Sequence, residues 1–482
     1  MFLYPVIEEE VFAIYAHLSA RELAVEVKKN EGFREKMAAA LLQKCSSAQK
    51  EYDLFSSWYG EKIAQKYKEV ISEKASSDKK LLGVPYVLDD TICSLAFPAA
   101  CGSPMLQNYR PPFEAYAVSL LSRAGAFLCG KARVAEFGLG CLEESPLGAV
   151  TANPRGKGHI AGSGAAAAVA SGAVSFALGV DTTGELREAA SYCGIFALKP
   201  SYGAISRRGL IGFSPSLEQA GILASRSSDL ALVFQEIAVR DPQDATSRET
   251  FSFSPQGDQA KIRKIAVPKD WSSVPSLHEE VKKVFADKLE QLTAMGFELD
   301  YISLPHFFYA PAAGSLLAAV EAFSSLANYD GVRFGCREEG RHLQEMYTKT
   351  RSRGFGKRSS NFIIFGALVS SGKYYDKYFV QAQKLRTLIK RELLACLLEY
   401  DCLLTPTVPF TAPLLGRKAS DHGGLNFVEA SYTMAANLAG LPALSYPVLS
   451  EGSLPLGLQF IGRDKGEADL IEIASFLKKE NF

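Results

Sequence analysis

The feature that most constrains the fold is an alternation of helix-like and strand-like segments that begins near residue 83. The Ala-rich run 165–170 is followed by the apolar run 175–180, and the helix-like segment 115–123 is followed by the apolar run 126–129. Such alternation is typical of a sheet with helices packed on it. The sequence therefore predicts an α/β fold in which a mixed β-sheet core is flanked by helices on both faces.

The first 75 residues differ from this alternating region. Residues 21–44 and 49–74 are rich in Ala, Glu, Lys and Leu, and their apolar residues recur at helical spacing. The Gly-Val-Pro run at 83–85 then interrupts the helical pattern, and short strand-like runs follow it. We therefore predict an N-terminal helical segment over residues 1–75, packed outside the sheet, and one large domain over residues 76–482.

Composition and charge argue against several classes of function. The chain has 53 Lys and Arg residues and 53 Asp and Glu residues, and this balance argues against broad electrostatic binding to nucleic acid. Its nine cysteines include no Cys-x-x-Cys pair, which is typical of free thiols in a reducing compartment. The N-terminus lacks the pattern of a signal peptide. We expect a cytoplasmic protein with no direct contact to nucleic acid or membranes.

One uncharged stretch and one Gly-rich loop need separate explanations. Residues 160–180 are long enough to span a bilayer, but they are mostly Gly, Ala and Ser, which favours a close-packed helix and strand inside a core. The loop at 156–164 lacks the ending of a phosphate-binding loop. No two histidines have metal-ligand spacing, and no Gly-x-Ser-x-Gly elbow occurs. The sequence therefore predicts no cofactor and no metal ion.

A series of ordered motifs begins with residues 177–190. Further motifs lie at 329–335, 354–357, 437–442 and 455–462. Together they resemble the amidase-signature family, and in particular the A subunits of glutamyl-tRNA(Gln)/aspartyl-tRNA(Asn) amidotransferases. The resemblance implies the amidase-signature fold, a role related to translation, and partner subunits of the B and C type.

The family's catalytic positions hold unexpected residues in this chain. Members hydrolyse glutamine with a Ser–cis-Ser–Lys triad and pass the ammonia to a partner subunit, which amidates misacylated tRNA. The resemblance places Asp89 at the position of the lysine and Glu185 at the position of the nucleophilic serine. Ala161 falls at the position of the cis-serine, and a gap in the alignment would bring Ser163 there instead. We expect Asp89, Ala161 and Glu185 to converge in one pocket.

The substrate-binding positions also differ from the family pattern. Phe362 stands where an arginine grips the substrate carboxylate, and Ala430 stands where an aspartate holds the substrate amine. Glu429, next to Ala430, is a candidate for the same role displaced by one residue. Arg351 is retained and is a candidate residual contact for an anion.

These replacements lead to three hypotheses about function. The first, which the replaced triad favours, expects no catalytic residue: a pseudo-amidase with a degenerate triad that has lost glutamine hydrolysis and acts as a binding or scaffolding homologue. The second is a functional A subunit that supplies ammonia from glutamine for tRNA amidation. The third is an enzyme with altered chemistry centred on Asp89 and Glu185, because two carboxylates buried in one pocket raise at least one pKa.

Overall fold

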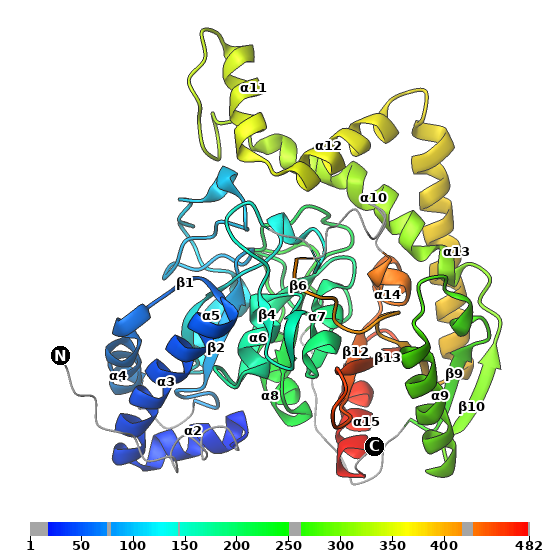
Figure 1. Ribbon diagram of the computed structural model, residues 1–482, viewed down its shortest axis with the longest axis horizontal. Helices are drawn as coiled ribbons and strands as arrows, with labels where there is room; N and C mark the ends of the chain where they lie inside the picture. The colour runs from blue at the N-terminus through cyan, green and yellow to red at the C-terminus, as the bar shows by residue number, and fades with distance from the viewer. Residues whose placement is uncertain (1–17, 75–78, 143–144, 250–261, 417–427, 481–482) are drawn as a thin grey trace.

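The protein is built around one large sheet, shown in Figure 1. The computed structural model describes residues 18–74, 79–142, 145–249, 262–416 and 428–480. Across the sheet, the strands follow the order β1 (Phe55–Trp58), β3 (Phe127–Ala132), β2 (Pro85–Asp89), β6 (Phe176–Asp181), β8 (Gln219–Ala224), β7 (Phe196–Lys199), β12 (Ala443–Val448), β13 (Leu456–Gly462), β11 (Cys402–Pro406), β9 (Lys264–Pro268) and β10 (Glu298–Ile302). Parallel and antiparallel neighbours both occur, so the predicted mixed sheet is confirmed.

Helices cover both faces of this sheet (Figure 1). Strands β2, β8, β11 and β13 are buried along their whole length. Successive side chains of a strand point to opposite faces, so each of these strands is covered on both sides. The helices are α2 (Ala20–Lys29), α3 (Glu31–Tyr52), α4 (Ile63–Lys74), α5 (Tyr116–Arg123), α6 (Gly164–Ala170), α7 (Glu185–Cys193), α8 (Ser227–Ile237), α9 (Glu279–Ala294), α10 (Ala310–Ser325), α11 (Leu343–Gly354), α12 (Lys357–Ser370), α13 (Val380–Glu399), α14 (Met434–Ala439) and α15 (Glu467–Lys479).

Two large hydrophobic clusters share the strands of the sheet. Leu404 and Phe460 belong to the cluster that includes the N-terminal helices, whereas their chain neighbours Leu403 and Ile461 belong to the cluster around α10 and α13. Alternate residues of one strand thus enter different clusters, because they point to opposite faces. Neither cluster is a core independent of the sheet. The boundary that we predict near residue 75 stays a prediction.

The N-terminal segment contributes a strand to the sheet. Helix α3 ends at Tyr52, and Asp53 takes a left-handed conformation with φ of 55° that turns the chain. Strand β1 follows and pairs antiparallel with β3. The rings of Phe55 and Trp58 stack with their centroids 5.3 Å apart. The predicted helix over 49–74 is therefore wrong at β1, where aromatic side chains favour a strand against an available sheet edge.

The uncharged stretch 160–180 folds as predicted. It forms helix α6, capped by Ser163, and strand β6, which lies between β2 and β8 in the sheet. Among the described helices, Phe307–Asn328 is the one stretch long and apolar enough to cross a membrane. This stretch includes α10, whose Ala313 and Leu317 are buried in the second cluster. A single helix of this kind is weak evidence for a membrane span.

Candidate active site

The candidate site lies where β6 ends and α7 begins. Residues 182–184 join the strand to the helix, and every residue of α7 is buried. Gly184 adopts a φ of 127° in this turn. A Cβ added at Gly184 would lie 2.1 Å from Oγ1 of Thr433, so a larger residue would displace its neighbours. The turn therefore requires glycine immediately before the helix.

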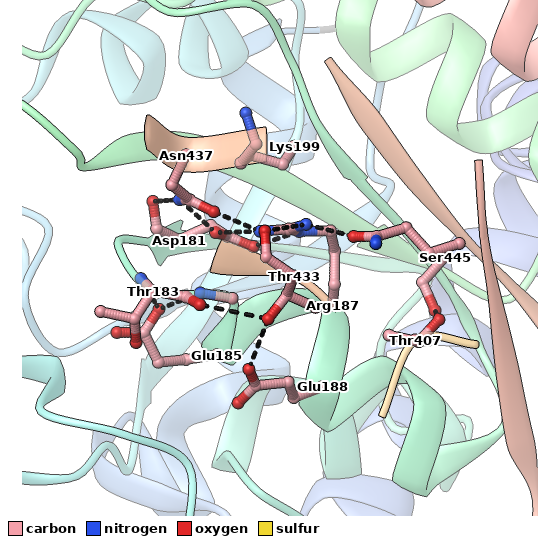
Figure 2. Close-up of polar contacts among 12 residues, drawn as sticks. Asp181, Thr183, Glu185, Arg187, Glu188, Lys199, Thr407, Thr433, Asn437 and Ser445 are labelled. Carbon is pink, nitrogen blue, oxygen red and sulfur yellow. Dashed lines mark hydrogen bonds and ion pairs between the residues drawn. The ribbon is translucent and has the colours of Figure 1, made fainter. Parts of the chain in front are cut away.

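Arg187, in the first turn of α7, anchors the helix to the core (Figure 2). Its Nε and Nη2 donate to the two oxygens of Asp181 at 2.9 Å each, and Nη1 donates to the carbonyl of Thr433 at 3.1 Å. Side-chain oxygens of Asn437 and Gln459 accept two further bonds. Burial acts to raise the pKa of Asp181, but the adjacent guanidinium outweighs it and holds that pKa below its usual value. The network fixes the start of α7.

Glu185 is the first residue of α7, and its carboxylate folds back over the preceding turn. Oε2 accepts hydrogen bonds from the backbone N–H groups of Thr182 and Thr183 at 2.8 Å and of Gly184 at 3.1 Å. Its other oxygen, Oε1, has no hydrogen-bond partner within the described part of the chain. Burial, and then the charge of Asp181, raise the pKa of Glu185 to about 7, against the opposing effect of the N–H groups. The group therefore titrates near neutral pH.

Asp89, the last residue of β2, presents a second carboxylate. Its Oδ2 accepts a hydrogen bond from the backbone N–H of Val180 at 3.1 Å, while Oδ1 lacks a partner among the residues that the structure describes. Burial raises the pKa of Asp89 to about 7, although the Val180 N–H and the charge of Lys131 act to lower it. The charge of Glu185 also raises this pKa, so the two carboxyl groups interact.

Asp89 and Glu185 line one cavity with a volume of about 30 Å³. This is room for a water-sized molecule. The prediction that these two residues meet in one pocket is confirmed. Ala161 is not among the described residues that line it: it is fully buried, and its carbonyl accepts a hydrogen bond from Sγ of Cys193. Ser163 lines the cavity instead, which agrees with the gapped alignment.

A buried lysine next to the site was not predicted from the sequence. Lys131 lies on β3, paired with Leu88 of β2, and its Nζ donates to the carbonyl of Ile92. Nζ also lies 3.9 Å from Oδ1 of Asp90. Burial lowers the pKa of Lys131, and Asp90 opposes that effect. A lysine directly after the apolar run 126–129 was the sequence signal that could have indicated this buried cation.

A third buried carboxylate was also missed. Glu188 lies one helical turn after Glu185, and Figure 2 shows Oγ1 of Thr433 donating to it, at 2.8 Å. Sγ of Cys141 donates to its other oxygen at 3.1 Å. Burial, and then the charge of Glu429, raise the pKa of Glu188 well above its usual value. Residues three apart lie on the same face of a helix, so the spacing between Glu185 and Glu188 was the sequence signal that could have indicated this carboxylate.

The predicted substrate-binding positions are not among the described residues that line the small cavity. Phe362 is buried in the core, with its ring edge-on to Phe213 at a centroid distance of 6.2 Å. Ala430 is fully buried, and Glu429 beside it is buried too. Arg351 is half-buried, and its Nη1 donates to two backbone carbonyls at 2.9 Å. The roles of these four residues toward a substrate stay predictions.

A larger hollow of about 920 Å³ lies between α10 and α12, away from the carboxylates. The described residues that line it are different from those around the smaller cavity. These walls are mostly apolar, with Phe308, Leu316, Phe365 and Leu368 among them, and the residues described there include no charged side chain and no histidine. The described lining therefore offers no carboxylate, lysine or histidine to act as a base in amide hydrolysis, despite the hollow's greater volume.

Comparison with known proteins identifies the family. An amidase family model matches residues 36–471. The chain belongs to the amidase family. One relative, the A subunit of glutamyl-tRNA(Gln) amidotransferase from Carboxydothermus hydrogenoformans, is 37% identical over 470 residues, which are 95% of this chain and 96% of that protein. The corresponding protein of Geobacter metallireducens is 40% identical over 403 residues, 82% of each chain. The crystal structure of the corresponding Thermotoga maritima protein matches with a TM-score of 0.79 at 31% identity, covering 96% of this chain and 95% of that one.

These comparisons correct the prediction of a non-catalytic homologue. Relatives that match this chain at 37–40% identity over most of its length are A subunits of glutamyl-tRNA(Gln) amidotransferases, which favours a working amidotransferase component. The hypothesis of a pseudo-amidase with a degenerate triad is therefore wrong. It rested on the residue types at the three triad positions and the two substrate-binding positions, whereas the match extends over the whole fold. The residues at these positions remain Asp89, Ala161 and Glu185, so the chemistry has to be explained with them.

Proposed function

We propose that this protein is the A subunit of a glutamyl-tRNA(Gln) amidotransferase, and that it releases ammonia from glutamine for partner subunits of the B and C type. The observation that carries the proposal is the match, over 95% of the chain and at 37% identity, to a protein of this kind. We place the protein in the cytoplasm together with these partners. Because the relatives are named as subunits, the activity should be measured on the assembled complex.

The carboxylate pair offers a route to amide hydrolysis that needs no serine. In this route an ionised Glu185 accepts a proton from water while the water oxygen bonds to the amide carbon. The protonated carboxyl of Asp89 gives its proton to the amide nitrogen as the carbon–nitrogen bond breaks. Glutamine and water thus become glutamate and ammonia. Two interacting carboxyl groups with pKa values of about 7 suit these roles at neutral pH.

Hydrogen bonds assign the two roles within the pair. Three backbone N–H groups stabilise the ionised form of Glu185, whereas a single N–H group faces Asp89. On this ground we assign Glu185 as the base and Asp89 as the carboxyl group that carries the proton. The cavity has room for the attacking water. The amide group has to enter beside it, so turnover requires the cavity walls to open.

The test compares two nitrogen donors in the assembled enzyme. The chain is purified with B- and C-type subunits, and amidation of glutamyl-tRNA is measured with glutamine or with saturating ammonium chloride. We expect Glu185→Gln and Asp89→Asn to lower the glutamine-dependent rate at least about 100-fold, while the ammonium-dependent rate is unchanged. Glu280→Gln, at an exposed position on α9, is the matched control.

The outcomes separate the two parts of the proposal. A complex that amidates tRNA with neither donor contradicts the assignment to this amidotransferase. If the Glu185→Gln complex keeps the wild-type rate with glutamine, only the carboxylate mechanism is contradicted. Loss of both rates in the Glu280→Gln control would show that the assay reports the integrity of the complex.

A further inference from the structure

Positive charge is concentrated in one stretch of the chain, from Lys357 to Arg391. This stretch includes eight Lys and Arg residues and one acidic residue, Asp376. The whole chain has 53 residues of each sign, so the rest of it carries an acidic surplus. The expectation of no direct contact with nucleic acid rested on the balance over the whole chain. The local surplus leads to a different inference for this surface.

Two lysines of this stretch lie beside the large hollow. The stretch contains α12, the π-helix Tyr375–Phe379 and α13, and Figure 1 shows α12 and α13 meeting at the top right of the view. Tyr374 and Tyr378, at this corner, line the hollow. The Nζ of Lys373 lies 5.3 Å from the ring centroid of Tyr374, and the Nζ of Lys377 lies 5.4 Å from that of Tyr378. Two ammonium groups therefore lie against its aromatic wall.

The hollow has the size and the lining of a site for nucleobases. Its volume of about 920 Å³ lies in the range of sites for small organic groups. Phe308 and Phe365 line it together with the two tyrosines, and Ser276 and Ser431 bring hydroxyl groups. Aromatic side chains stack on any base, because every base has a π-face. Bases can therefore enter this hollow while their phosphates stay at the lysines.

The cations continue beyond the hollow along α13, which favours a polyanion over a small anion. Lys384 and Arg391 are exposed and seven residues apart, which is about two helical turns, so they share one face of the helix. Glu392, the next acidic residue, is engaged by Nδ1 of His306 at 2.6 Å. An anion with a single head group would use only the lysines at the hollow. A strand of phosphates uses the whole series.

We propose that this surface binds a single strand of RNA, with bases in the hollow and phosphates along a basic row formed by Lys373, Lys377, Lys384 and Arg391. The bases of a single strand are free to stack on protein side chains, whereas a duplex keeps them paired inside. Which strand binds rests on the proposed function: glutamyl-tRNA carries its amino acid at an unpaired 3′ end. The surface holds that end beside the subunit that releases ammonia.

The test measures RNA binding by the purified full-length chain, using fluorescence anisotropy. The probe is a labelled single-stranded RNA of about 12 nucleotides, and a duplex of the same sequence should bind at least about fivefold more weakly. Lys373→Gln/Lys377→Gln should weaken strand binding at least about tenfold. It should also lower the slope of log Kd against log salt by about 1.4, because each phosphate contact contributes about 0.7. Lys36→Gln/Lys50→Gln, at two exposed positions of α3, is the matched control.

Tyr378→Leu tests the hollow separately from the charge. Leucine keeps an apolar side chain but removes the ring, so we expect at least about fivefold weaker strand binding with an unchanged salt slope. Intact tRNA should displace the probe, and tRNA trimmed of its unpaired 3′ nucleotides should displace it at least about fivefold less well. Equal displacement by the two tRNAs would overturn the assignment to the 3′ end.

The remaining outcomes separate this surface from the proposed function. Absence of strand binding overturns the inference, as does equal binding by wild type and the Lys373→Gln/Lys377→Gln variant. Binding of oleate, an anion with one head group, in place of the strand would overturn the assignment to RNA. Amidation by the assembled complex without strand binding would reject this surface and leave the proposed function standing. Strand binding without amidation from either nitrogen donor would do the reverse.

Discussion

Asp89 and Glu185 carry a pH dependence of stability that can be predicted from their surroundings. Both have a pKa of about 7 in the folded chain, above the ordinary values of 3.8 and 4.5. The folded chain therefore binds more protons than the unfolded chain between these limits. The stability from the two groups is present below pH of about 4 and is lost as the pH rises to about 7.

The Asp89→Asn/Glu185→Gln variant tests this sign. We expect its free energy of unfolding to fall less than that of wild type as the pH rises from about 4 to about 7, because neither amide titrates. Urea unfolding of both proteins across this range gives the difference directly, and other titrating groups cancel in it. Parallel curves would show that the two carboxyl groups have ordinary pKa values.

Arg187 is the residue whose loss should destabilise the fold most clearly. Arg187→Met leaves Asp181 buried without its ion-pair partner, and we expect a loss of about 3–5 kcal/mol in the free energy of unfolding. Arg341→Met is the matched control: Arg341 pairs with Glu345, but its side chain is 85% exposed, so the expected loss is below about 1 kcal/mol. Equal losses in denaturant unfolding would contradict the prediction.

At the scale of elements, strand β1 depends on a glycine in its neighbour. A Cβ added at Gly130 of β3 would lie 2.5 Å from the carbonyl oxygen of Ser57 and 2.6 Å from Cβ of Trp58. We expect Gly130→Ala to cost about 1–3 kcal/mol and to speed hydrogen exchange in residues 55–58. Gly372→Ala, where nothing lies within 4 Å, should change neither quantity. Exchange that rises evenly over the whole sheet would contradict this local account.

At the scale of the whole molecule, the continuous sheet predicts one cooperative unit. The chain has two tryptophans, Trp58 in β1 and Trp271, whose ring packs edge-on to Phe285 of α9. These tryptophans report on opposite ends of the sheet, where β1 and β9 lie. We expect Trp58→Phe and Trp271→Phe to give fluorescence transitions with the same urea midpoint after correction for stability by circular dichroism. Separate midpoints would show that the sheet unfolds in parts.

The sequence by itself determined the α/β class, the mixed sheet and the meeting of Asp89 with Glu185. Helical and strand periodicity is a property of neighbouring residues. The ordered motifs place Asp89 at the end of β2 and Glu185 at the start of α7, just after β6. The residues at the triad and substrate-binding positions misled when they were used alone to judge function, because a few side chains say little about the role of a whole fold.

Only the tertiary structure decided which groups surround those carboxylates and how they titrate. Thr433 bonds to Glu188 across 245 residues of sequence, and Lys131 faces the site from a neighbouring strand. Strand β1 formed because a sheet edge was available to it, and Ser163 rather than Ala161 reached the cavity wall. Burial, charge and cavity volume arise from residues far apart in the chain, so no local pattern contains them.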